Sequence, residues 1–344
     1  MTMDLTGGLD PVREYVFANR PDDPEMRDAV NVWIESDDGA FGMRIGIEAV
    51  AATWEAHDIW LDIAFADGRV ISFRESHKAH PALDENGLAT IRGAGPLAFQ
   101  CRVPFQRWTA SFRGLAPETT AAHLANGLLV NSPGLVDVVF DLDLTMAAPP
   151  WVPGTLSAEA RAILSGKQGD FVSPRYEQLF CVQGSMRVGD DVFDVTGSGL
   201  RIRRQGIRRL EGFWGHCWQS AVFPSGKAFG YNCYPPKVDG EPTYNEGYIF
   251  DGRGVLQPAR AVVIPWLERL HTAGDDVSCV LETAAGTVAI AGTTFINTRS
   301  VNKGSAVLPP DFPIVQQAHA RFRWDGEESC GMTERSTPPS KIMR

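Results

Sequence analysis

The sequence predicts an all-β protein that contains two antiparallel β-barrel domains and a few short helices. Three observations support this prediction. The 344 residues include 34 glycines and 23 prolines, a share that suits many turns between short strands. Asp-Gly or Asn-Gly pairs, the strongest short signal for a β-hairpin, recur along the whole chain. Apolar and polar residues alternate with a period of two on either side of several of these pairs.

The hairpin signals can be followed in order along the chain. The segment Ile59–Phe65 alternates before one such pair, and Val70–Phe73 returns after it. Later, Tyr248–Phe250 and His319–Trp324 each lead into another pair. The pairs are Asp38-Gly39, Asp67-Gly68, Asn86-Gly87, Asn126-Gly127, Asp239-Gly240, Asp251-Gly252 and Asp325-Gly326.

Helix signals are few. Ser157 is a suitable N-cap for a helix over Ser157–Ser165, and Glu159 stands in its first turn. The segments Pro117–Ala125 and Pro265–His271 could each form two turns. No strand is followed by a GxGxxG or Walker motif, which disfavours nucleotide-binding α/β folds.

The boundary between the domains is expected in the segment Ala147–Phe171, which begins with a rigid, proline-rich stretch. A new run of strands starts at Tyr176. The prediction is therefore one barrel over residues 1–160 and a second over residues 171–344. Domains of this size can close eight-stranded barrels around a cavity.

Charge and composition exclude several classes of protein. The net charge is −10, and residues 1–60 carry 13 acidic residues against four arginines, which argues against a nucleic-acid partner. The longest apolar runs fall far short of the roughly 20 residues of a membrane span. Residues 1–10 lack the pattern of a secretory signal, which favours a cytoplasmic location. The oligomeric state stays open, a homodimer included.

No cofactor or metal is expected. The six cysteines are scattered without a CxxC pair, so they are expected to be free thiols. No histidine pairs with a cysteine at a spacing familiar from zinc sites.

The segment Arg201–Pro236 holds the densest group of candidate ligand-binding residues. A strand over residues 210–220 would place Trp214, His216 and Trp218 on one face, and the returning strand would add Tyr231 and Tyr234. Such aromatic side chains could line a pocket for an apolar ligand. They could equally fill an ordinary core.

Proton transfer has three candidates. Glu334 and Glu211 lie in strand-like apolar runs, where burial would make a carboxyl group a usable acid. His216 is the third, because histidine titrates near neutrality; Glu177 is a weaker choice. The nearby arginines could instead hold Glu211 ionised.

Five arginines lie within nine residues. They are Arg201, Arg203, Arg204, Arg208 and Arg209. They could bind an anionic substrate group, with Arg201 as the candidate ligand, or they could pair with the acidic N-terminal region.

Several segments resemble the hydroxyneurosporene synthase (carotenoid 1,2-hydratase) and AttH-like group. Residues 32–49 and 59–73 resemble the opening strands of its first barrel, and residues 175–208 resemble the start of its second. "GYIFDGRGVL" and "CGMTERS" resemble its later strands. The resemblance implies two lipocalin-like barrels. Many relatives carry Arg-Asp-His-Ser-Trp-Gly where this chain matches only Arg201 and Gly206, so no chemistry of that motif is transferred.

Members of the group with known activity add water to, isomerise or cyclise apolar isoprenoid or polyketide molecules, so the resemblance implies the first of two functional hypotheses. In the first, the protein is a cofactor-independent lyase or isomerase of the hydratase, dehydratase or cyclase type, acting on an apolar isoprenoid- or steroid-like molecule. An acid would protonate the substrate, and aromatic rings would stabilise the resulting cation. In the second, the protein binds or carries a hydrophobic small molecule without chemistry. A cavity in which every ionisable residue is salt-bridged would favour the second.

Overall fold

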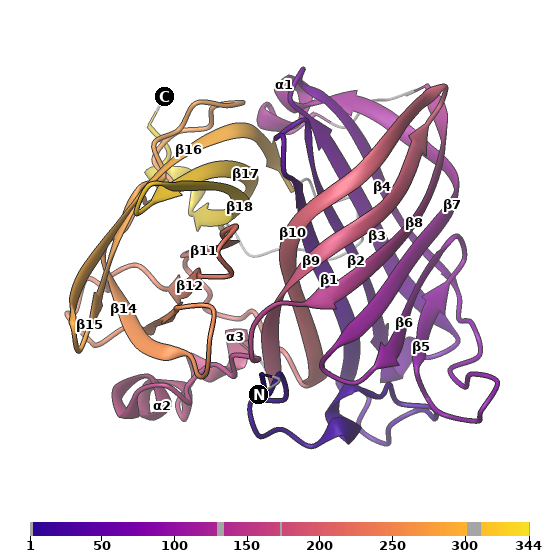
Figure 1. The fold of residues 1–344 in the computed structure, drawn as a ribbon, viewed down its shortest axis with the longest axis horizontal. Coiled ribbons are helices and arrows are strands. Elements are labelled where there is room, and N and C mark those ends of the chain that lie inside the picture. Colours follow the sequence, from indigo (N-terminus) through magenta and orange to yellow (C-terminus); the bar gives the residue numbers. More distant parts are fainter. Residues whose placement is uncertain (1–2, 129–133, 173, 301–310, 344) are drawn as a thin grey trace.

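The computed structural model describes residues 3–128, 134–172, 174–300 and 311–343, which form two antiparallel β-structures side by side (Figure 1). The first is a ten-stranded sheet in the order β4-β3-β2-β1-β10-β9-β8-β7-β6-β5. Its strands are β1 (Arg27–Ser36), β2 (Phe41–Val50), β3 (Ala56–Phe65), β4 (Arg69–Lys78), β5 (Ile91–Ala94), β6 (Leu97–Val103), β7 (Arg107–Thr120), β8 (Leu135–Met146), β9 (Arg175–Val188) and β10 (Asp191–Gly206).

An additional pairing joins this sheet to itself. Residues 69–71 of β4 pair with residues 118–120 of β7, so that eight of the ten strands form a ring. Alternate side chains, such as Val30, Val32 and Ile34 of β1, point into the apolar interior of this first barrel. The intervening residues, such as Asn31 and Trp33, therefore face outward.

The second structure is a closed barrel of eight strands. They are β11 (His216–Val222), β12 (Ala228–Cys233), β13 (Asn245–Phe250), β14 (Gln257–Val263), β15 (Cys279–Thr283), β16 (Gly286–Arg299), β17 (Ile314–Trp324) and β18 (Glu327–Thr337). Its interior is packed with residues that include Cys217, Phe229, Tyr231 and Phe322. The all-β prediction with two barrels is thus confirmed, and all six cysteines are free.

The strand pairing differs from the expected division of the chain. Residues 175–206, assigned to the second domain from the sequence, form β9 and β10, which pair with β8 and β1 of the first barrel. The second barrel begins only at His216. The resemblance of residues 175–208 to the start of a second barrel therefore places those strands differently from the structure. A hairpin pattern shows that two strands pair with each other, but not which sheet they join.

Turns and helices follow the sequence signals in part. The pairs Asp38-Gly39, Asp67-Gly68 and Asp325-Gly326 connect β1 to β2, β3 to β4 and β17 to β18. Their glycines have φ values of 71°, 93° and 76°, which favour glycine. The helices are α1 (Ala121–Ala125), α2 (Ala158–Leu164) and α3 (Gly169–Val172), with 3-10 turns η1 (Pro11–Glu14), η2 (Ala51–Thr53) and η3 (Pro339–Lys341).

The helix over residues 157–165 is confirmed, and the Ser157 side chain accepts the backbone N–H of Ala160 as an N-cap. The other two helix predictions are largely wrong. Residues 117–120 continue β7, and only residues 121–125 are helical. Residues 265–271 form no helix. No helix in the described part of the chain is long and apolar enough to cross a membrane.

The barrels meet through their outer faces. An apolar cluster at the contact includes Trp33 of β1, Ile202 of β10 and Trp218 of β11. A buried polar contact joins Glu35 of β1 to His319 of β17, with 3.0 Å between Oε1 and Nδ1. A cavity lies within this contact region between the barrels.

Candidate functional site

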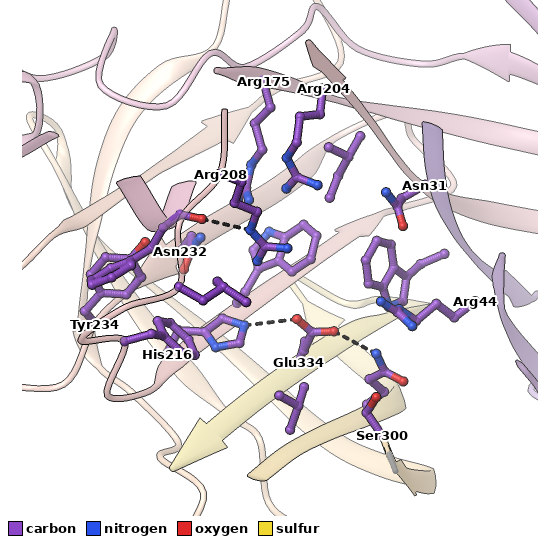
Figure 2. Close-up of a pocket in the computed structure, with 18 of the residues that line it drawn as sticks. Asn31, Arg44, Arg175, Arg204, Arg208, His216, Asn232, Tyr234, Ser300 and Glu334 are labelled. Carbon is purple, nitrogen blue, oxygen red and sulfur yellow. Dashed lines mark hydrogen bonds and ion pairs between the residues drawn. The ribbon is translucent and has the colours of Figure 1, made fainter. Parts of the chain in front are cut away.

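A cavity of about 210 Å³ lies between the two barrels rather than inside either one. Figure 2 shows its polar side chains converging from both. Strand alternation explains this location. The odd-numbered residues of β11 point into the interior of the second barrel, whereas His216 and Trp218 point to the opposite side and line the cavity. Its described lining consists of Asn31, Trp33, Arg44, Phe171, Arg175, Ile202, Arg204, Arg208, Leu210, Phe213, His216, Trp218, Asn232, Tyr234, Ser300, Phe312, Val315, Gln317 and Glu334.

His216 and Glu334 form a hydrogen-bonded pair at this cavity. The antiparallel register places β18 beside β11, and Nε2 of His216 lies 3.1 Å from Oε1 of Glu334. The second carboxylate oxygen accepts a 3.1 Å hydrogen bond from the Gln317 side chain on β17. Both members of the pair face the cavity, as Figure 2 shows.

The surroundings of Glu334 stabilise its charge. Burial opposes ionisation, but the hydrogen bond and charge of His216, together with Arg44 and Gln317, outweigh it and lower the pKa of Glu334 to about 2. An ionised carboxylate only accepts hydrogen bonds, so Nε2 of His216 carries the shared proton.

Ser336 orients the imidazole from the other side. Its hydroxyl accepts the backbone N–H of His216 at 3.0 Å and lies 2.5 Å from Nδ1 of the same residue. Ser336 is buried and is not among the residues that line the cavity. It therefore positions His216 and is not placed to attack a substrate.

Aromatic rings form a wall of the cavity. Trp218 meets Trp33 edge to face, with 4.9 Å between ring centroids. The indole N–H of Trp218 donates to Glu177 at 3.0 Å, and the Arg175 guanidinium lies 5.5 Å from its ring centre. Trp218 thus fills the core between the barrels and also lines the cavity.

Comparison with known proteins gives a family. A family model described as Domain of unknown function (DUF7064) matches residues 13–339. The chain belongs to this family. No curated protein matches the sequence of this DUF7064 chain.

Solved structures share the fold of the DUF7064 chain. A candidate AttH from Nitrosomonas europaea matches with a TM-score of 0.56 and 16% identity, over 90% of this chain and 92% of that chain. CghA in complex with Sch210972 matches with a TM-score of 0.55 and 9% identity, over 98% and 97%. Kievitone hydratase from Nectria haematococca has a TM-score of 0.48 and 9% identity, over 97% and 96%.

At such identities the similarity shows the fold alone. The expected resemblance to AttH-like proteins is confirmed at that level. The relation to hydroxyneurosporene synthase stays a prediction.

Four of the expected site residues come together in this DUF7064 protein. His216, Trp218, Tyr234 and Glu334 all line the cavity. Trp214 does not line it, but packs behind Tyr234 with 5.4 Å between ring centroids.

The other three lie elsewhere. Tyr231 points into the second barrel, because β12 pairs it with Gln219, whose side chain also points inward. Glu211 is exposed in a turn, since β11 starts at residue 216 rather than at 210. Arg201 is buried in the first barrel and donates to Glu14 at 2.7 Å.

The arginine cluster divides between two locations. Three members bind acids of the N-terminal region: Arg201 to Glu14, Arg203 to Asp28 and Arg209 to Glu25. The remaining two, Arg204 and Arg208, line the cavity.

Arg44, Arg175 and Gln317 are cavity residues that sequence reasoning missed. Each lies in an alternating strand pattern, but nothing in that pattern distinguishes a polar residue facing water from one facing the other barrel.

Proposed function

We propose that the cavity between the barrels is the active site of a cofactor-independent hydro-lyase or isomerase. It would act by acid–base chemistry on a small isoprenoid-like molecule. The observation that carries the proposal is the His216–Glu334 pair, fixed by Ser336 and Gln317 and open to an aromatic-walled cavity. Positioned acid–base groups in a desolvated site are the minimal equipment for such reactions.

In the proposed reaction, protonated His216 gives a proton to a carbon–carbon double bond or a hydroxyl of the substrate. The π electrons form the new C–H bond, or water leaves, and a carbocation remains. The indole rings of Trp33 and Trp218, which line the cavity, stabilise that cation, and Glu334 supplies the opposing charge. Addition of water, whose extra proton passes to the imidazole, or loss of a neighbouring C–H proton to the imidazole, completes the reaction and restores protonated His216.

This assignment changes the role expected for Glu334. The sequence favoured it as the acid, but its lowered pKa suits an anion that balances His216. The volume of about 210 Å³ lies below the 300–1,000 Å³ typical of sites for drug-sized ligands. It supports a monoterpene-sized substrate over a steroid.

The test is incubation with small isoprenoid alcohols and alkenes in D₂O. Mass spectrometry would detect deuterium at carbon or a change of one water. His216→Gln should lower turnover by about 10²–10⁴-fold, the usual contribution of a general acid or base. The control is His77→Gln, which alters a partly buried histidine of β4 outside the cavity. Full turnover in His216→Gln would refute the proposal.

The second candidate is a carrier without chemistry. It is favoured by the pairing of Glu334 with His216 and of Arg175 with Glu177, since paired groups can be purely structural. A carrier would bind the same molecules, incorporate no deuterium and keep its affinity in His216→Gln.

A further inference from the structure

The cavity has an excess of buried positive charge. Its described lining contains four arginines, Arg44, Arg175, Arg204 and Arg208, but Glu334 is its sole carboxylate. In Figure 2 the side chains of Arg175, Arg204 and Arg208 extend from the side opposite Ser300. Buried charges normally require a partner of opposite sign.

Three of these arginines have partners. A carboxylate oxygen of Glu177 lies 2.6 Å from Arg175, and Arg208 donates to the Phe171 carbonyl at 3.1 Å. Arg44 lies 3.8 Å from Asp62. For Arg204, no hydrogen bond or ion pair of the side chain exists with any residue in the described ranges.

The strand register shows why Arg204 has no partner among the residues that the structure describes. On β9 its direct cross-strand neighbour is Arg175, a like charge, which is an unfavourable pair. On β1 its neighbour is Ala29, which offers no charge. Glu48, the residue opposite Ala29 on β2, is occupied by Arg27 at 2.7 Å.

Burial makes this arrangement of like charges costly. Arg204 is only 4% exposed, and its Nε has no acceptor among the described residues. Burial, followed by the charges of Arg208 and Arg175, lowers the pKa of Arg204 well below its ordinary value. An anion at this position would remove both the repulsion and the unsatisfied donor.

We propose that Arg204, supported by Arg175 and Arg208, binds a carboxylate or similar anionic oxygen group of the ligand. The guanidinium fork matches a carboxylate with two parallel hydrogen bonds. The ligand is thus an anionic apolar molecule, with its charged group at Arg204 and its hydrocarbon part against Trp33 and Trp218. This inference deepens the proposed function by naming the substrate class, and rests on it for the cavity being the place where substrate binds.

Two matched pairs of probes test the inference: geranic acid with methyl geranate, and cinnamic acid with methyl cinnamate. Binding is measured at pH 7.5 by calorimetry and tryptophan fluorescence. At least one acid should bind at least about tenfold more tightly than its ester, the scale of one charge-assisted hydrogen bond. Arg204→Gln should abolish that difference and leave ester binding unchanged. Arg209→Gln, an exposed arginine of the same segment, is the control and should change neither.

The melting temperature separates a binding role from a structural one. Arg204 is a buried charge without a partner in the described ranges, so its removal should keep or raise the melting temperature of Arg204→Gln. A variant that melts lower and loses acid and ester binding equally would mean that Arg204 is structural. Equal affinity for acid and ester in the wild type, or no saturable binding of either acid, would overturn the inference.

These binding measurements need no turnover. Acid selectivity without deuterium incorporation would refute the proposed catalysis and keep the anion site. Turnover of neutral substrates with no acid selectivity would support the proposed catalysis and refute the anion site.

Discussion

Glu14→Gln should strongly destabilise the first barrel. Glu14 is fully buried, and one carboxylate oxygen accepts from Arg201 at 2.7 Å and from the hydroxyl of Tyr176. The other accepts from the indole of Trp108 and from the backbone N–H of Phe105. A glutamine keeps one acceptor oxygen, turns an NH₂ group toward the remaining donors, and leaves the buried guanidinium without its counter-charge.

The magnitude follows from these contacts. Breaking a buried ion pair by removing one partner costs about 3–5 kcal/mol, and that range already includes the orphaned donors. The total stability of a domain is about 5–15 kcal/mol, so the loss is large. Urea denaturation followed by circular dichroism would show it as a lower midpoint with an unchanged slope.

The matched control is Glu25→Gln. Glu25 also pairs an N-terminal carboxylate with an arginine of the 201–209 cluster, at 2.6 Å, but both side chains are more than half exposed. The midpoint should barely move, because water screens exposed pairs. The double variant Glu14→Gln/Arg201→Gln should recover part of the lost stability. A Glu14→Gln protein within about 1 kcal/mol of the wild type would refute the reasoning about buried charge.

Three further outcomes are expected. Trp218→Ala should lower stability by about 3–5 kcal/mol through cavity formation and also weaken geranic acid binding; a variant that melts lower but binds normally would remove Trp218 from the binding wall. The partner arginines hold the pKa values of Glu14 and Asp28 low despite burial, so their contribution to stability is present above their unfolded values near pH 4 and disappears as pH falls further. Thermal melts from pH 7 to pH 3 should show this loss, and flat melting temperatures would contradict it. Gly42→Ala would place a methyl carbon 2.1 Å from Cγ of His319, so it should lower the melting temperature, and adding His319→Ala should restore part of it.

Local patterns in the sequence predict the strands better than they predict the neighbours of each strand. The alternation around Asp67-Gly68 and Asp325-Gly326 suffices to place two hairpins, because a tight turn and its flanking strands are encoded within about twenty residues. The pairing of β1 with β10 joins Arg27 to Gly206, and no local signal carries that information.

The site shows the same limit. Alternation correctly groups His216 with Trp218, but it leaves open whether their face points into a barrel or toward a neighbouring one. The sequence predicts Tyr231 on that face, whereas the register pairs it with Gln219 and turns it into the second barrel. Arg204 and Glu334 meet at one cavity only because the barrels dock, which is a tertiary event.

The late arrival of β9 and β10 in the first barrel constrains how the protein can fold during synthesis. The N-terminal strands β1 to β8 cannot close their ring until residue 206 has left the ribosome, since β1 and β8 each pair with this hairpin. Until then both expose unpaired edges, which are templates for aggregation. A nascent chain that pauses when residue 170 has just emerged from the ribosome should therefore depend on chaperones more than one that pauses when residue 215 has emerged.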